Sequence, residues 1–561
     1  MLVPAEPLRI RVRSWLQARL PVAAAHELLA HKTVPLHRHS LWYYLGGIIL
    51  TCFLTLIITG SLLVLYYRPD VPRDPRAPGA YESVQNLVTA IPHGWWIRSI
   101  HHWAANTMVM AVLIHLFSVL LLKAYRRPRE FTWWTGLVLL GLTMTSAFTG
   151  YLLPWNDLSF AATRVGGGIA GAVPLAGPFI RQLLLAGPDV TELTLPRFFG
   201  LHVVILPMTI GLVIALHVVL IACHGSSVPP SAERDRAAGR SFASIRFWPD
   251  FALRDARVFV LLLGALATVA YVLPPGTGTR ADPLAPTPEG IQPEWYFLSV
   301  YKVLKMMPAH VLGLEGLQFG VILFGVIGLM LAALPLLDAP PDESAPQRRR
   351  AAWLRRLLLA VAAALACAAS LPPLLEALDA RTTAGLTAWA RLGAIAAVAA
   401  AWLLVGLWLD RTAERRPNGA ATLFGMTLTS GAIGYTLWGG VGAAPALVAL
   451  ALFWAVLLLT MAAGRSDACK ASHRTRWPAL LLLVALLGGT IPLGRAHEHL
   501  GAPDETSVRA VHAKTPVAPA ARRDESRKRL VALLVALMFL LAALQRRLRL
   551  QEHMHDAGAT P

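Results

Sequence analysis

The sequence predicts an all-α polytopic membrane protein, and three observations carry this prediction. Of the 561 residues, 55% are hydrophobic, and the mean hydropathy of +0.53 is higher than a soluble chain of this size normally has. Apolar runs of about 17 to 25 residues recur along the whole chain, which is the length of a helix that crosses a bilayer. Basic residues gather between these runs. We therefore expect about twelve spanning helices.

The apolar runs define the predicted spans in order. They cover residues 42–66, 98–122, 133–153, 199–223, 257–273, 317–337, 353–371, 392–409, 420–439, 443–463, 477–494 and 530–544. The last run is short and follows the charged segment RRDESRKR, so it either spans the bilayer or lies in the interface. Two long connections, 154–198 and 274–316, are expected to form short helices folded against the bundle.

The charge distribution indicates the orientation of the chain. The net charge of +19 does not predict a nucleic-acid binder, because the basic residues lie between apolar runs and not on a soluble domain. Basic segments such as KAYRRPRE and DRTAERR follow every second span, and the first 41 residues are also basic. The positive-inside rule then places both termini in the cytoplasm of a bacterial cell. No secretory signal peptide is evident before the first apolar run.

Four histidines stand out on two of the predicted spans. His101 and His115 are 14 residues apart, which on a helix separates them by about 40° and about 21 Å along the axis. His202 and His217 are 15 apart, or about 60° and about 22 Å. Both spans begin at the outer face and run parallel, so the histidines form two levels. His102 points elsewhere and is interpreted as a packing residue.

Two imidazoles that face each other at one depth can bind a haem iron on both axial sides. Glycines with the same 14-residue period lie on the two neighbouring spans, and glycine lets a flat macrocycle approach a helix backbone. These glycines are Gly46, Gly60, Gly136 and Gly150. The alternative is that the histidines only pack helices together. Two matched histidine pairs with two matched glycine pairs favour a four-helix bundle that holds two b-type haems.

Two further residue types refine this site. Arg98 lies one turn before His101 and either pairs with a haem propionate or reaches to the interface. The four cysteines are single, and no Cys-x-x-Cys pair exists. The chain therefore contains no motif for a covalent c-type haem and no iron–sulfur domain.

At this point the sequence resembles the cytochrome b subunit of quinol-oxidising bc and bf complexes. The segments LGGIILTCFLTLIITG, GWWIRSIHHW, TGYLLPWNDLSF, LPRFFGLHVVILP and PEWYF match that family's motifs in order, over about residues 15 to 375. The 15-residue histidine spacing is typical of bf proteins, in which the part after the fourth span is a separate subunit. Here both parts share one chain.

The resemblance implies a role for each motif. His101 and His202 would bind the low-potential haem on the outer side, and His115 and His217 the high-potential haem on the inner side. The PEWY motif would line the outer quinol-oxidation site. Its residues are Pro293, Glu294, Trp295 and Tyr296. Glu294 would accept a proton from the quinol, since desolvation raises the pKa of a carboxyl group, and Tyr296 would shape the site.

The sequence also departs from the family. In bf proteins a cysteine that attaches an extra haem comes just before LGG, whereas this chain has Tyr44 there. No covalent extra haem is therefore expected. The segment AATRVGGG after PWNDLSF lacks the bulkier aromatic pattern of the family, so the loop beside the quinol site is expected to differ in shape.

These observations predict five regions. They are a cytoplasmic segment (1–41), a dihaem four-helix domain of the cytochrome b N-terminal type (42–225), a cytoplasmic linker (226–256), a C-terminal part that carries PEWY (257–410) and an extension of unknown role (411–561). We predict the dihaem cytochrome b of a bacterial quinol:cytochrome c oxidoreductase that is coupled to proton translocation and embedded in the cytoplasmic membrane. The expected partners are a Rieske-type iron–sulfur protein, a c-type cytochrome, quinone, lipid and a second copy of the chain.

Two alternatives remain open. In one, the chain is a dihaem membrane anchor of another quinone-linked oxidoreductase and the PEWY segment has no chemistry. In the other, it is a scaffold or transporter without redox function, in which the histidines are packing residues.

Overall fold

The computed structural model describes residues 32–36, 40–71, 79–228, 244–284 and 293–337, together with positions 233, 236, 238–239, 353 and 357. Within this part the chain is mostly helical, which confirms the all-α membrane fold class. Five helices are long and apolar enough to cross a bilayer. The predicted spans after residue 337, and with them the extension 411–561, lie outside the described residues.

The described helices follow the predicted order. The spanning candidates are α3 (Tyr44–Val64), α5 (Gly94–Leu121), α6 (Glu130–Leu152), the continuous stretch α9 (Thr194–Gly200), η2 (Leu201–Ile205) and α10 (Leu206–His224), and α14 (Gly316–Leu337). α12 (Ala252–Val272) coincides with the predicted span 257–273. Shorter helices occupy the connections: α4 (Ala80–Thr89), α7 (Asp157–Gly171), α8 (Gly177–Leu185) and α13 (Trp295–Met306).

Short strands, which were not predicted, supplement the helices. β1 (Thr33–Pro35) pairs antiparallel with β2 (Ser244–Arg246), and β3 (His310–Val311) with β4 (Leu314–Glu315). The β1–β2 ladder joins the segment before α3 to the segment before α12. It therefore ties the start of the bundle to the linker that follows α10.

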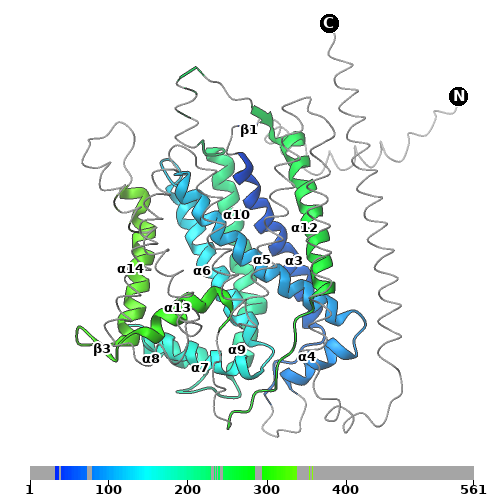
Figure 1. Ribbon diagram of the computed structural model, residues 1–561, viewed down its shortest axis with the longest axis vertical. Coiled ribbons are helices and arrows are strands. Elements are labelled where there is room, and N and C mark those ends of the chain that lie inside the picture. The colour runs from blue at the N-terminus through cyan, green and yellow to red at the C-terminus, as the bar shows by residue number, and fades with distance from the viewer. Residues whose placement is uncertain are drawn as a thin grey trace, which may run out of the picture. The chain divides into compact units, whose positions relative to one another are not determined.

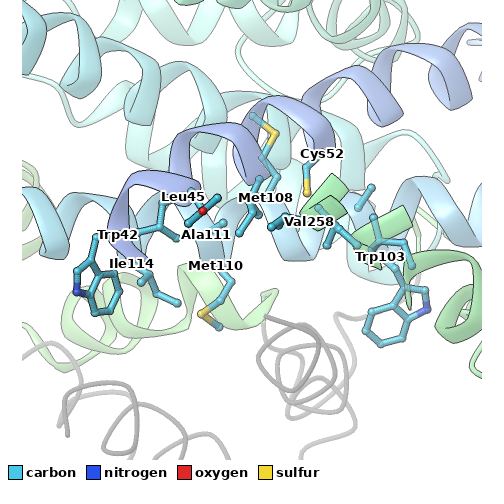
Figure 2. Packing of buried hydrophobic residues seen from close by; sticks show 14 of the residues in the cluster. Trp42, Leu45, Cys52, Trp103, Met108, Met110, Ala111, Ile114 and Val258 are labelled. Atoms are coloured by element: carbon cyan, nitrogen blue, oxygen red, sulfur yellow. The ribbon is translucent and has the colours of Figure 1, made fainter. Parts of the chain in front are cut away.

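The bundle is built from two helix pairs. α3 packs along α5, and α6 packs along α10, while α5 also contacts α6 (Figure 1). α12 lies against both α3 and α5. Figure 2 shows the core at this junction, where side chains such as Leu45 and Cys52 of α3 lie near Met108 of α5 and Val258 of α12. These side chains are at most 5% exposed, so α12 completes the core of the first helix pair.

Side chains of α5 bind backbone carbonyls at the end of α12. Trp96 Nε1 donates to the carbonyl of Ala267 at 3.1 Å, Ser99 Oγ to that of Ala270 at 2.6 Å, and Trp103 Nε1 to that of Leu273 at 2.8 Å. Buried donors need such acceptors, because an unpaired one costs about 1–3 kcal/mol. This set of hydrogen bonds joins the four-helix part to the part that follows it.

A second connection joins α6 to α14. Pro335 lies inside α14 and has no N–H, so the carbonyl of Leu331, four residues earlier, loses its helical partner. Trp133 Nε1 of α6 donates to that carbonyl at 2.8 Å, and Trp134 Nε1 donates to the carbonyl of Ala332, also at 2.8 Å. The proline therefore creates an acceptor that fixes α14 against the bundle.

Candidate functional site

The structure brings His101 and His202 together, and we call these residues the first pair. His101 lies on α5, and His202 lies in η2. Their ring centroids are 6.4 Å apart and the rings are inclined by 72°. A metal bonded to both rings at about 2.0–2.1 Å would place the centroids roughly 6.3 Å apart. The separation of the first pair therefore fits two axial ligands of one iron.

A wide helical turn places His202 in this position. Over Leu201–Ile205 the helix makes a π-turn, and the N–H of Leu206 bonds to the carbonyl of Leu201, five residues earlier. Such a turn absorbs one extra residue. The 15-residue spacing between His202 and His217 then corresponds to a 14-residue spacing in a regular helix, which is the spacing of His101 and His115. The rotation of about 60° expected from a regular helix is thus too large for this segment.

His115 and His217 form the second pair. They lie on α5 and α10, further along both helices, and are close enough to interact electrostatically. α5 and the continuous helix formed by η2 and α10 each carry one member of both pairs, so the second pair lies further along these helices than the first.

Threonines orient three of the four imidazoles. Thr59 Oγ1 lies 2.9 Å from Nδ1 of His101, Thr149 Oγ1 lies 3.1 Å from Nδ1 of His202, and Thr135 Oγ1 lies 2.8 Å from Nδ1 of His217. Each hydroxyl also bonds to the carbonyl four residues earlier in its own helix, at distances of 2.7 to 3.0 Å.

These contacts favour one tautomer of the rings. A hydroxyl has one proton, and each of these hydroxyls is placed to donate it to its own helix. It is then free to accept from Nδ1–H of the histidine, and we assign the bonds in this direction. In a neutral imidazole with its proton on Nδ1, Nε2 carries a free lone pair. No hydrogen bond reaches Nε2 of His101, His202 or His217 within the described part of the chain. These nitrogens are therefore available as metal ligands.

Each of the three threonines precedes a predicted glycine, and each glycine faces the same histidine. A Cβ atom on Gly150 would lie 2.5 Å from Cε1 of His202, and one on Gly60 would lie 3.2 Å from Cε1 of His101. On Gly136 it would lie 3.4 Å from Cε1 of His217. The glycine period predicts clearance for a macrocycle, and in the structure these glycines also leave space for the imidazole rings. A Cβ atom on Gly46 would meet no protein atom within 4 Å.

Arg98 has a partner within the chain. Its Nη1 donates to the carbonyl of Pro275 at 2.8 Å, and its Nη2 donates to that of Gly276 at 2.9 Å. The guanidinium group has five N–H donors, so donors remain for a propionate. Its described contacts fix the segment that leaves α12.

The predicted PEWY residues lie at the start of α13. Glu294 is the residue before the first helical residue, and its carbonyl accepts from the N–H of Phe297 at 2.9 Å. The side chain is partly buried, and burial raises the pKa of Glu294 to about 7. Burial, followed by the charge of Glu294, also raises the pKa of Tyr296 well above its ordinary value. Pro293 is partly buried next to this pair.

Two contacts attach this motif to the bundle. Trp295 Nε1 donates to Oδ1 of Asn106 on α5 at 2.7 Å. The ring of Phe297 meets Phe148 and Tyr151 of α6, with ring centroids 5.9 and 6.3 Å apart. The PEWY segment therefore rests on the two helices that hold or face the first pair.

Comparison with known proteins decides the family. Residues 106–279 match the family model described as cytochrome b (N-terminal)/b6/petB, and residues 280–389 match the model described as cytochrome b (C-terminal)/b6/petD. The chain is 39% identical over 331 residues to the cytochrome bc complex cytochrome b subunit of Chlorobaculum thiosulfatiphilum, covering 59% of this chain and 74% of that protein. The chain belongs to the cytochrome b family.

Other relatives agree with this membership. Cytochrome b6 of Synechococcus elongatus is 40% identical over 219 residues, which cover 39% of this chain and 99% of that protein. Among solved structures, a chain of a hyperthermophilic respiratory complex III is similar to this chain with a TM-score of 0.55 and 27% identity. The match covers 70% of this chain and 96% of that one. The predicted resemblance is therefore confirmed for both the b6-like part and the part that carries PEWY.

Two residues of this cytochrome b were not singled out by sequence reasoning. Asn106 follows His101 on α5 in a run that reads as ordinary span, so only the structure reveals its bond to Trp295. Asp255, near the start of α12, has a buried Oδ1 with no hydrogen-bond partner in the described part of the chain. A Cβ atom on Gly47 would lie 3.2 Å from that oxygen. In the sequence Asp255 lies between arginines and reads as a topology signal.

Tyr44 lies where the bf proteins are expected to carry a cysteine. Its ring is 7% exposed and stacks on Phe251 with centroids 5.0 Å apart and an angle of 21°. In this cytochrome b, an aromatic pair therefore occupies the start of α3.

Proposed function

We propose that this cytochrome b is the dihaem electron-transfer subunit of a quinol-oxidising bc-type complex. The observation that carries the proposal is the first pair, two facing imidazoles whose Nδ1 atoms donate to threonines and whose Nε2 atoms are free of hydrogen bonds. The second pair lies further along the same helices, and there Nδ1 of His217 contacts a threonine hydroxyl. The four proposed ligands are His101, His202, His115 and His217.

The proposed chemistry divides between the cofactors and the chain. When bound, two b-type haems supply one-electron carriers at two depths of the membrane, so that electrons released on one side reach the other. The chain's own part is to orient the imidazoles of His101, His202 and His217 through threonine hydroxyls and to keep the glycine faces open beside them. Arg98 is proposed to contact a propionate with donors that its backbone partners leave free.

Glu294 is proposed to accept the proton that leaves the quinol hydroxyl. A general base works best when its pKa lies near the working pH, and burial raises the pKa of Glu294 to about 7. Tyr296 stays protonated under these conditions and can donate a hydrogen bond to a quinol oxygen. Trp295 and Pro293 are proposed to fix the start of α13 and thereby the position of the Glu294 carboxyl group.

We infer the remaining features from the family and from the sequence. The first pair and PEWY would lie on the outer side of a bacterial cytoplasmic membrane, with both termini inside, and quinol oxidation would be coupled to proton translocation. The acceptors would be a Rieske-type iron–sulfur protein and a c-type cytochrome on separate chains, and the protein would form a homodimer in lipid. The relative named as a subunit of a cytochrome bc complex supports the assembly with separate partner chains.

A haem count tests the proposal. The purified chain is reduced with dithionite, and its haem is quantified as the pyridine adduct. Two b-type haems per chain are expected, and His217→Ala should leave one, whereas the control His224→Ala should leave two. A chain without haem would support a scaffold or transporter. Two haems without inhibitor-sensitive quinol:cytochrome c activity, measured in membranes that hold the whole complex, would support an anchor for another oxidoreductase.

A further inference from the structure

The two histidine pairs differ in what their Nδ1 atoms contact. Both members of the first pair bond to threonine hydroxyls, at 2.9 and 3.1 Å. In the second pair only His217 has such a partner, at 2.8 Å, while Nδ1 of His115 is buried with no hydrogen-bond partner in the described part of the chain. The first pair thus has two hydroxyl acceptors and the second pair has one.

The sequence contains the same asymmetry. Three of the four predicted glycines follow a threonine, namely Gly60, Gly136 and Gly150. The fourth, Gly46, follows Leu45, which has no polar atom and is fully buried. The sequence thus supplies a threonine beside three of the four glycines and none beside the fourth.

An acceptor on Nδ1–H changes the electronic character of an imidazole ligand. Drawing the proton toward the acceptor makes the ring more basic, so Nε2 donates more electron density to a bound metal. The oxidised metal, which carries one more positive charge, gains more from that density than the reduced metal. Each such hydrogen bond therefore lowers the reduction potential of the metal that the histidine binds.

We propose that these threonine hydroxyls set the order of the two haem potentials in this protein. Thr59 and Thr149 lower the potential at the first pair, while Thr135 alone lowers it at the second pair. The count of two against one makes the first pair the low-potential site. This inference rests on the proposed haem function, and it assigns a physical cause to a potential order that the family resemblance only implies.

The test is a potentiometric titration of the b-type absorption band in Thr59→Val, Thr149→Val and Thr135→Val. The wave that persists in His217→Ala identifies the first pair. Loss of an outer-shell partner typically changes a metal site by 10- to 100-fold, and a tenfold change in a one-electron equilibrium is about 59 mV. Thr59→Val and Thr149→Val should each shift the first wave upward by about that amount and leave the second wave in place. Thr135→Val should do the reverse.

The chain offers matched controls. Thr55 and Thr145 lie one turn before Thr59 and Thr149 and bond only to the carbonyls four residues earlier. Thr55→Val and Thr145→Val should therefore leave both waves unchanged. Thr59→Ser keeps the hydroxyl and should restore the wild-type potential. Thr59→Ala is titrated as well, so that a haem-binding defect specific to valine does not decide the outcome.

Three results would overturn the inference. The first is that Thr59→Val and Thr149→Val have the same first-wave potential as the controls, and the second is that both waves shift equally. The third is that Thr59→Ser shifts the first wave as much as Thr59→Ala does. The haem count keeps this test separate from the function. Two haems with unmoved potentials would leave the proposed function standing and reject the role of the threonines. A wild-type chain without haem would reject the function itself.

Discussion

Gly150→Ala probes the tightest contact in the site. The added Cβ atom would lie 2.5 Å from Cε1, 3.1 Å from Nε2 and 3.2 Å from Nδ1 of His202. Unstrained carbon atoms stay about 3.5–4.0 Å apart, so the ring must move by roughly 1 Å. That movement breaks the hydrogen bond from Nδ1 to Thr149, which is 3.1 Å long, and displaces Nε2 from its present position.

The expected magnitude follows from the cost of overpacking. Adding a methyl group to a filled site typically costs about 1–3 kcal/mol, and about 1.36 kcal/mol corresponds to a factor of ten. Retention of a haem at the first pair should therefore weaken by roughly 5- to 150-fold. The helix itself gains about 0.5–1 kcal/mol when alanine replaces glycine, so a general loss of folding is not expected.

The assay is haem content per chain after extended dialysis, together with the potentiometric wave of the first pair. Gly150→Ala should approach one haem per chain. Gly60→Ala, whose Cβ atom would lie 3.2 Å from Cε1 of His101, should show a smaller loss. Gly136→Ala, at 3.4 Å from Cε1 of His217, should remain near wild type. Gly141 is the control on the same helix, because a Cβ atom there meets nothing within 4 Å.

A particular ranking would refute this reasoning. If Gly150→Ala keeps two haems and an unshifted first wave, the contact with His202 does not limit haem binding. If Gly141→Ala loses haem to the same extent as Gly150→Ala, the effect comes from the helix and not from the imidazole.

Two further predictions concern the PEWY segment. Because burial raises the pKa of Glu294 to about 7, the group is protonated below that pH and cannot accept a proton. Quinol oxidation by the assembled complex should therefore fall about tenfold per pH unit below pH 7. Glu294→Gln should be slow and lack this decrease at acid pH, while the exposed control Glu315→Gln should keep it. Asn106→Leu leaves Trp295 Nε1 without its acceptor, which costs about 1–3 kcal/mol. Quinol oxidation should slow with two haems retained. Thr107→Val should not slow it, because it removes a buried hydroxyl that has no partner among the described residues. An unchanged rate in Asn106→Leu would show that the bond does not position the motif.

The sequence was sufficient to predict the two levels of histidines, because helical periodicity depends only on spacing. His101 and His115 lie on one helix as expected, and the first pair meets across the bundle. The π-turn around His202 was not predictable, since a local change from four to five residues per hydrogen bond leaves no compositional trace. His202 and His217 are therefore closer in their positions along the helix to His101 and His115 than the 15-residue spacing indicates.

The threonines and Asn106 show another limit of sequence reasoning. A threonine within an apolar helix commonly bonds to its own backbone, so Thr59 and Thr149 look ordinary until the neighbouring helix is placed. Asn106 is a single amide in an apolar span, and its partner Trp295 is 189 residues away in the chain. Contacts between distant segments depend on how the helices pack, which periodicity alone does not specify.

One turn of α6 contacts both the PEWY segment and His202. Phe148 and Tyr151 are three residues apart, so they share a face, and both contact Phe297 just after PEWY. The residues between them include Gly150, which lies on another face and meets His202. Residues 148–151 therefore contact both the segment that carries the proposed proton acceptor and one of the proposed haem ligands. A displacement of this turn would therefore disturb both the PEWY segment and His202.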